Sequence, residues 1–361
     1  MDGMQDRTAP AGERAVGEAV PARVEPLGFH GDGWSYFRIW IVNVALTILT
    51  LGLWSPWAKV RTNRYFYGAT ELAGSRFAYL ADPWVIFRGR LVALLVVLAW
   101  MAANAASPAL GLLLGLAFLP LVPWLICRSL AFRARNSAWR GVRFGFDGRY
   151  VEALTAYLLW PFLAQVTLGL LGPVMLREQD RFTVGRARFG TTRIHHEARL
   201  GPYWRLWLTA AAIGLAGLAA FVTLVLVARP EGGAEPGAAF AAAGALAMGL
   251  WLLALVLAMA LVAVGRMNLR YGHLRIGPHR LRSRFRLGPF LRLQLGNTLG
   301  LILTLGLFWP WAAVRTARYL ADHLALEVRG DLEGFVAAQD AGQVGAVGDE
   351  VGEALGLEVG F

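Results

Sequence analysis

Uncharged apolar stretches alternate with arginine-rich segments along most of the chain. A helix needs about 20 apolar residues to cross a bilayer, and five stretches reach that length: Ile39 to Ala58, Ala153 to Leu176, Leu206 to Ala228, Gly237 to Gly265 and Leu293 to Val314. A sixth stretch, Leu91 to Cys127, holds no charge over 37 residues, and its central Asn104 to Pro108 predicts a turn between two spans. The pattern predicts a mainly α, polytopic helical membrane protein.

Three of these stretches carry the same motif. Thr-Leu-Gly-Leu occurs at 50–53, 167–170 and 304–307, followed at a constant offset by Pro56, Pro173 and Pro310. Eight residues after each proline stands an arginine, namely Arg64, Arg181 and Arg318. The first and third copies also share Asn43 and Asn297, where the more diverged middle copy has Trp160. Agreement at fixed spacing predicts an internal repeat.

The repeat suggests a division of the chain into five parts. We expect a disordered segment over 1–27, repeat unit one over 28–127, a diverged unit two over 128–265, a partial unit three over 266–330, and an acidic disordered tail over 331–361. Each full unit combines a broken apolar segment with a hairpin of two unbroken spans. The tail has seven acidic and no basic residues, a composition typical of disorder. The first 27 residues lack the apolar core of a signal peptide.

The basic residues predict an orientation. Lys and Arg flank each broken segment on both sides, whereas the turn at 104–108 has no charge and the turn at 229–236 has one arginine. Under the positive-inside rule, placing both turns outside leaves every Lys and Arg but Arg229, 34 of 35, on the cytoplasmic side. The hypothesis is four complete spans and three re-entrant or interfacial helix–break–helix elements. The alternative is seven kinked spans, because each segment is long enough to cross.

The breaks are the candidate site. Proline cannot bond the carbonyl four residues earlier, which here always belongs to the motif glycine, so we expect a free carbonyl at each break. Transporters bind substrates at such interruptions. The candidate residues are Asn43, Thr50, Gly52, Pro56, Thr167, Gly169, Pro173, Asn297, Thr304, Gly306 and Pro310. In the alternative interpretation each proline begins a second helix, and the asparagines are hydrogen-bonding contacts between helices.

The basic linkers predict small cytoplasmic β-hairpins and lipid contact. Tyr65 to Tyr79 and Arg186 to Ile194 alternate like strands around glycines. Arginines near a membrane attract anionic headgroups, and the candidate headgroup-binding residues are Lys59, Arg61, Arg64, Arg181, Arg315 and Arg318. The net charge of +11 does not predict nucleic-acid binding, because the basic residues alternate with membrane spans and no recognition module is present. Membrane lipids are the expected partners, and the oligomeric state stays open.

No pattern predicts catalysis. The chain has no nucleophile elbow, paired-carboxylate signature or zinc-peptidase motif, so we expect neither an enzyme nor a cofactor. The pair His195 and His196, with only Glu197 nearby, lacks the spacing of a metal site. The single cysteine, Cys127, excludes an intramolecular disulfide.

The run from Phe29 to Gly68, with its Thr-Leu-Gly-Leu, Pro-Trp and Val-Arg-Thr-x-Arg-Tyr motifs, closely resembles the YjgN-like inner-membrane proteins of bacteria. The resemblance extends through Arg90 and returns at Arg140 to Thr192 and at Leu293 to Tyr319. It implies a bacterial inner-membrane location but no substrate. Two hypotheses follow: a transporter or channel component for a small solute, with its site at the breaks, or a non-transporting scaffold, lipid-binding or regulatory protein with a basic cytoplasmic face.

Overall fold

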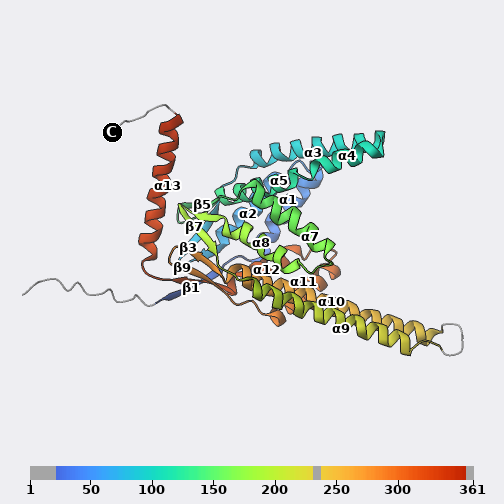
Figure 1. The fold of residues 1–361 in the computed structure, drawn as a ribbon. Helices are drawn as coiled ribbons and strands as arrows, with labels where there is room; N and C mark the ends of the chain where they lie inside the picture. Colours follow the sequence, from blue (N-terminus) through green and yellow to red (C-terminus); the bar gives the residue numbers. More distant parts are fainter. Residues whose placement is uncertain (1–21, 231–236, 355–361) are drawn as a thin grey trace, which may run out of the picture.

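The computed structural model describes residues 22–230 and 237–354 and contains a closed antiparallel β-barrel (Figure 1). Its strands are β1 (Arg23–Phe29), β2 (Thr70–Leu72), β3 (Ser75–Tyr79), β4 (Ser137–Trp139), β5 (Val142–Phe146), β6 (Ala187–Phe189), β7 (Thr192–His196), β8 (Leu274–Ile276), β9 (His279–Ser283) and β10 (Leu324–Val328). Each strand pairs with its neighbours in sequence, and β1 closes the barrel against β10 with Arg23 opposite Val328.

The barrel corrects the expected fold class. Small cytoplasmic β-hairpin elements in a mainly helical protein are predicted from the sequence, and that description is wrong, because the hairpins at 70–79 and 187–196 are parts of one closed barrel of ten strands. Local alternation identifies a hairpin, but it carries no information on whether the two outermost strands meet. Closure depends on residues 23–26 pairing with residues 325–328.

Five helical excursions leave the barrel, each between two neighbouring strands. They are α1 (Gly33–Leu49) with α2 (Ser55–Ala69); α3 (Pro83–Ala106) with α4 (Pro108–Phe118) and α5 (Leu121–Arg135); α6 (Tyr150–Leu154), the π-helical turn η1 (Thr155–Leu159), α7 (Trp160–Val166) and α8 (Gly172–Gly185); α9 (Leu200–Val227) with α10 (Ala238–Tyr271); and α11 (Leu287–Leu303) with α12 (Trp309–Asp322). The tight turns at Gly74, Gly141, Gly190 and Gly277 join the other ends of the strands. All five excursions therefore start and end on one rim of the barrel.

This shared rim bears on the choice between four complete spans and seven kinked ones. Both ends of each broken segment are attached to the same barrel, so a broken segment cannot end on the opposite side of a membrane from where it began. By length and composition, α3, α9 and α10 can each cross a membrane, and α4 with α5, bent by 45°, forms a fourth candidate. Among the described residues, the helices of the three broken segments do not reach this length and composition, which favours four complete spans over seven kinked ones.

Two segments expected to be disordered contain regular structure. Residues 23–27 belong to β1, and helix α13 (Leu332–Ala354) occupies much of the acidic tail, whereas 1–21 and 355–361 lie outside the described residues. Leu332 and Val336 of α13 are buried in the barrel core. The side-chain oxygen of Gln339 accepts hydrogen bonds from the amides of Thr191 and Thr192, both at 3.0 Å. Helix α13 thus covers the tight-turn end of the barrel, away from the helical arms (Figure 1).

The barrel interior is apolar and aromatic, and the exterior carries most of the strand arginines. The core is formed by Leu72, Trp139, Val142, Phe189, Leu326, Val328, Leu332 and Val336. On β7 and β8, Arg193 and Arg275 are exposed, while Ile194 and Leu274 are buried. The alternation of the strands thus separates the core from a basic outer surface.

Candidate functional site

The three Thr-Leu-Gly-Leu segments adopt one conformation. Each threonine ends a helix, and the following leucine and glycine both have positive φ: 49° and 92° at 51–52, 50° and 88° at 168–169, and 49° and 92° at 305–306. The prolines Pro56, Pro173 and Pro310 are buried at the start of the next helix. This geometry matches the alternative interpretation, in which proline begins a second helix.

The breaks leave no glycine carbonyl free, which corrects the sequence-based expectation. The carbonyl oxygens of Gly52, Gly169 and Gly306 accept hydrogen bonds from the amides of Ser55, Gly172 and Trp309 at 3.1, 2.9 and 3.1 Å. The threonine hydroxyls are used as well. Those of Thr50, Thr167 and Thr304 accept hydrogen bonds from the amides of Trp54, Leu171 and Phe308 at 2.9, 3.2 and 2.9 Å. Each break is therefore a self-satisfied turn between two helices.

The leucine at each turn is almost fully exposed on the protein surface. The exposed fractions are 95% for Leu51, 97% for Leu168 and 95% for Leu305. A non-glycine residue in the left-handed region costs about 1–2 kcal/mol, so glycine would be the cheaper residue at these positions. Each hairpin thus presents a strained, apolar tip that touches little of the protein.

The two asparagines act within separate hairpins. The side-chain oxygen of Asn43 on α1 accepts from Trp54 Nε1 at 3.4 Å and from Arg61 Nη1 at 3.5 Å. The side-chain amide of Asn297 on α11 donates to the hydroxyl of Thr316 at 3.2 Å. Among the described residues no hydrogen bond joins Asn43 to Asn297, so the structure gives each of them an interhelical contact and no shared site.

The six candidate headgroup-binding residues divide into three pairs by the contacts they make. Arg64 donates to the carbonyl of Ala81 at 3.3 Å, and Arg318 donates to that of Gly31 at 2.9 Å, so both join a short hairpin to the next loop on the rim. Arg61 contacts Asn43, and Arg315 lies over the ring of Phe308. In the described part of the chain, Lys59 has no ion pair, and Arg181 lies 4.0 Å from Glu178.

Sequence reasoning missed a buried charge cluster between α8 and the base of α9–α10. The carboxylate of Asp180 is fully buried and accepts from Arg266 Nε at 2.9 Å, from Arg270 Nε at 2.8 Å and from the hydroxyl of Tyr203 at 3.0 Å. The local signal was weak. Asp180 stands where the other two copies of the motif have Asn63 and Ala317.

The rim where the hairpins leave the barrel is charged unevenly. The residues that precede the first helix of each excursion are Asp32, Asp82, Arg149, Arg199 and Arg286, in chain order. Asp32 and Asp82 cap their helices with side-chain hydrogen bonds, and the hydrogen bonds from Ser35 hold the pKa of Asp32 below its usual range. The last three excursions therefore place arginine at the level where the helices begin.

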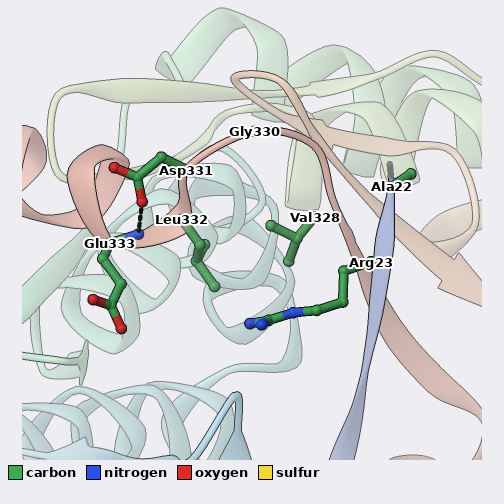
Figure 2. A pocket seen from close by; sticks show the side chains of 7 residues that line it. All are labelled: Ala22, Arg23, Val328, Gly330, Asp331, Leu332 and Glu333. Carbon is green, nitrogen blue, oxygen red and sulfur yellow. Dashed lines mark hydrogen bonds between the residues drawn. The ribbon is translucent and has the colours of Figure 1, made fainter. Parts of the chain in front are cut away.

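One apolar-lined cavity of about 640 Å³ lies at the other end of the barrel, between the start of β1 and the start of α13 (Figure 2). It is lined by Ala22, Arg23, Val328, Gly330, Asp331, Leu332 and Glu333. None of the residues at the breaks contributes to this cavity. The breaks and this cavity are thus separate features of the molecule.

The membrane-length helices and the basic rim define a multi-pass membrane protein. A family model described as a bacterial protein of unknown function, DUF898, matches residues 24–354, and the chain belongs to this family. It is 34% identical over 142 residues to the inner membrane protein YjgN of Escherichia coli O157:H7, 38% over 120 residues to that of strain K12, and 32% over 143 residues to that of Salmonella typhimurium.

These alignments cover 39%, 33% and 39% of this chain and 36%, 30% and 36% of the relatives. The chain thus spans about a third of the length of the curated relatives it matches. No solved structure matches. The relatives are named as inner membrane proteins, in agreement with the resemblance seen in the motifs.

Proposed function

We propose that this is a non-transporting, lipid-binding protein of the bacterial inner membrane. The barrel lies on the cytoplasmic side, the α3–α5 and α9–α10 excursions span the bilayer, and the three broken hairpins dip into the cytoplasmic leaflet. The observation that carries this proposal is the set of three closed turns with exposed leucine tips. Their shared conformation also supports an origin by internal repetition.

Free energies support insertion of the tips into lipid. The left-handed leucine costs about 1–2 kcal/mol, whereas moving a leucine side chain from water to hydrocarbon contributes about 1.5–3 kcal/mol. Leucine at a fully exposed turn is therefore favourable only when lipid surrounds it. Leu49 and Leu303 beside the turns are also exposed, which enlarges the apolar tip.

Helix length supports a re-entrant path. The second helices of the three hairpins have 15, 14 and 14 residues, which at about 1.5 Å per residue gives about 21–23 Å. The hydrocarbon core is about 30 Å thick. A hairpin held at the barrel rim thus reaches into the bilayer without crossing it.

Charge supports contact with anionic headgroups. Arg149, Arg199 and Arg286 stand on the rim where the helices enter, and a basic side chain close to an anionic membrane contributes about 1 kcal/mol. The positive-inside rule favours the cytoplasmic side for this rim. We further infer that the protein acts without catalysis, without a cofactor and without nucleic acid.

Transport is the second candidate. Repeated Gly/Pro interruptions favour it, but binding at a broken helix uses free backbone carbonyls, and here the carbonyls of Gly52, Gly169 and Gly306 are already bonded. Each asparagine side chain makes a contact within its own hairpin, while Asn43 Nδ2 and Asn297 Oδ1 are buried without a hydrogen-bond partner among the described residues. We therefore favour lipid binding.

The depth of the tips tests the proposal. Single cysteines at 51, 168 and 305, in a Cys127→Ser background, would carry an environment-sensitive fluorophore in vesicles containing lipids quenched at known depths. We expect quenching from within the cytoplasmic leaflet, while Arg280→Cys on the barrel exterior stays unquenched. Labelling of any tip by a membrane-impermeant reagent from the periplasmic side would contradict the proposal, and solute uptake that depends on Asn43 would favour transport.

A further inference from the structure

The excursion between β5 and β6 has features that the other broken hairpins lack. Its first helix, α6, passes into the π-helical turn η1, and π-helical turns occur often at functional sites. Beside this helix lies a polar cavity of about 190 Å³, lined by Asp147, Arg149, Glu152, Gly185, Arg186, Ala187 and Arg193. This volume equals about six waters at their liquid volume of about 30 Å³ each, which is ample room for a phosphate group.

The cavity has more positive than negative groups. Glu152 is paired with Arg186. Asp147 is shared by Arg188 and Arg193, whose Nε atoms lie 3.4 and 3.6 Å from its two oxygens. These contacts are longer than the roughly 2.7–2.9 Å of a charge-assisted hydrogen bond.

Arg149 adds a further positive charge. In the described part of the chain its side chain has no ion-pair partner, although its amide donates to Glu152 at 3.3 Å. Three guanidinium groups of the lining, those of Arg149, Arg186 and Arg193, thus face the carboxylates of Asp147 and Glu152. The lining therefore carries one positive charge more than negative charges, and Arg188 beside Asp147 adds another next to the cavity.

Two of these arginines are held close together by the fold. Arg188 on β6 lies directly opposite Arg193 on β7, and like charges at such positions destabilise a sheet. Arg188 packs over Gly145 on β5, where an added Cβ would lie 2.2 Å from Nε of Arg188. The carboxylate of Asp147 offsets part of the repulsion between the two guanidinium groups, and a bound anion would offset more of it.

From this geometry we propose that the cavity between α6, the end of α8 and β7 binds a phosphate group. Guanidinium groups match phosphate oxygens in pairs, which favours a phosphate over a compact halide. The site lies at the rim from which the hairpins leave, so both a phospholipid headgroup and a soluble phosphorylated molecule can reach it. The inference goes beyond the proposed function, because the site can bind phosphate even if the three tips do not enter the bilayer.

Two variants of opposite sign test the site in the full-length purified protein. Arg149→Ala removes the unpaired cation and should weaken phosphate binding about tenfold, the loss of one charge-assisted hydrogen bond. Glu152→Gln removes a negative charge and frees Arg186, so it should tighten binding severalfold. Arg280→Ala on the barrel exterior is the matched control and should leave binding unchanged.

Calorimetric titration in detergent with inorganic phosphate and with glycerol 3-phosphate reports a soluble ligand. Titration with nanodiscs of phosphatidylglycerol against nanodiscs of phosphatidylcholine reports a headgroup. The site is supported if, in either titration, binding is weaker in Arg149→Ala and tighter in Glu152→Gln than in the wild type. Absence of binding in both arms, or equal binding by Arg149→Ala, Glu152→Gln and Arg280→Ala, overturns it. The proposed function has a separate test: it is contradicted if a membrane-impermeant reagent labels the hairpin tips from the periplasmic side.

Discussion

The carboxylate of Asp180 on α8 lies 2.9 Å from Nε of Arg266 on α10, across 86 residues of sequence. A second guanidinium, that of Arg270, binds the same carboxylate oxygen. This cluster links helix α8 of a short broken hairpin to the base of the long α9–α10 hairpin. The apolar cluster of Leu176, Ala198 and Tyr203 packs between the same two hairpins, so Asp180 adds a buried charged contact to an apolar interface.

Replacing Asp180 by Asn should destabilise the protein. Breaking a buried ion pair costs about 3–5 kcal/mol, and the two arginines are about one-quarter exposed, so water offsets part of this cost and we expect about 1–3 kcal/mol. Thermal unfolding in detergent measures the effect. The control is Glu197→Gln, whose half-exposed side chain pairs with Arg275 at 3.5 Å and should change little. Equal melting temperatures for the two variants would refute a central role for Asp180.

The leucine tips allow backbone strain and insertion to be separated. Replacing Leu51, Leu168 and Leu305 by Gly should stabilise the detergent-solubilised protein by about 1 kcal/mol per site and move the hairpin tips out of the bilayer. Alanine at the same positions keeps the positive φ and should move the tips outward without the gain in stability. Unfolding curves give the first readout, and depth-dependent lipid quenching of a fluorophore at Leu49→Cys or Leu303→Cys gives the second. Unchanged quenching in both triple variants would contradict insertion driven by the tip leucines.

Helix α13 is expected to depend on one glutamine. Gln339→Ala leaves the amides of Thr191 and Thr192 without their acceptor, and an unsatisfied buried donor costs about 1–3 kcal/mol. Hydrogen exchange of residues 332–343 should therefore accelerate about tenfold or more. Asp340→Asn, at an exposed neighbouring position, is the control. Slow exchange in Gln339→Ala would show that the apolar contacts and the hydrogen bonds between Gln343 and Arg143 hold the helix without Gln339.

Lowering the pH should destabilise the tight-turn end of the barrel, which helix α13 covers. Burial lowers the pKa of His279, whose Nδ1 accepts from the amide of Arg329 at 3.2 Å and whose ring packs edge-on against Phe335. Because the folded protein disfavours the protonated ring, this contribution to stability is complete above pH 6.5 and is lost as the pH falls through the lowered pKa. The melting temperature should fall from pH 7 to 5 more steeply in the wild type than in His279→Gln. Parallel curves would contradict the assignment.

The difference between the two curves from pH 7 to 5 is assigned to His279, because burial also lowers the pKa of His196 but that residue is the same in both proteins. Glu327, the nearby carboxylate, has a pKa held below its usual range by hydrogen bonds from Arg282 and Arg329. Its contribution to stability is therefore lost only as the pH falls below that range. The two groups titrate in separate pH ranges.

Two glycines give a matched test of packing between the first and last hairpins. A Cβ at Gly33 would lie 2.3 Å from Cδ1 of Trp311 on α12, so Gly33→Ala should cost about 1–3 kcal/mol. Gly68 lies in α2 with no atom within 4 Å of an added Cβ, so Gly68→Ala should be neutral or stabilising by up to about 1 kcal/mol. Unfolding in detergent compares the variants. A stable Gly33→Ala protein would indicate that Trp311 is free to move.

Local properties of the chain were readable from the amino-acid sequence. Apolar length identified the membrane class, and the fixed spacing of Thr-Leu-Gly-Leu and proline identified three equivalent breaks, because both depend on residues within one or two helical turns. Alternation around Gly74 and Gly190 identified two hairpins for the same reason. The flanking arginines also led to the hypothesis that the broken segments return to the side from which they start.

The remaining features required the tertiary structure. Closure of β1 on β10 joins residues about 300 positions apart, and the partners of Asp180 come from a helix that follows a long apolar arm. The hydrogen bonding of the carbonyls of Gly52, Gly169 and Gly306 depended on a left-handed turn that proline alone does not specify. By itself the sequence determined which segments are apolar and where they break. Only the fold decided that all of them start from one barrel rim, because that depends on pairing between distant strands.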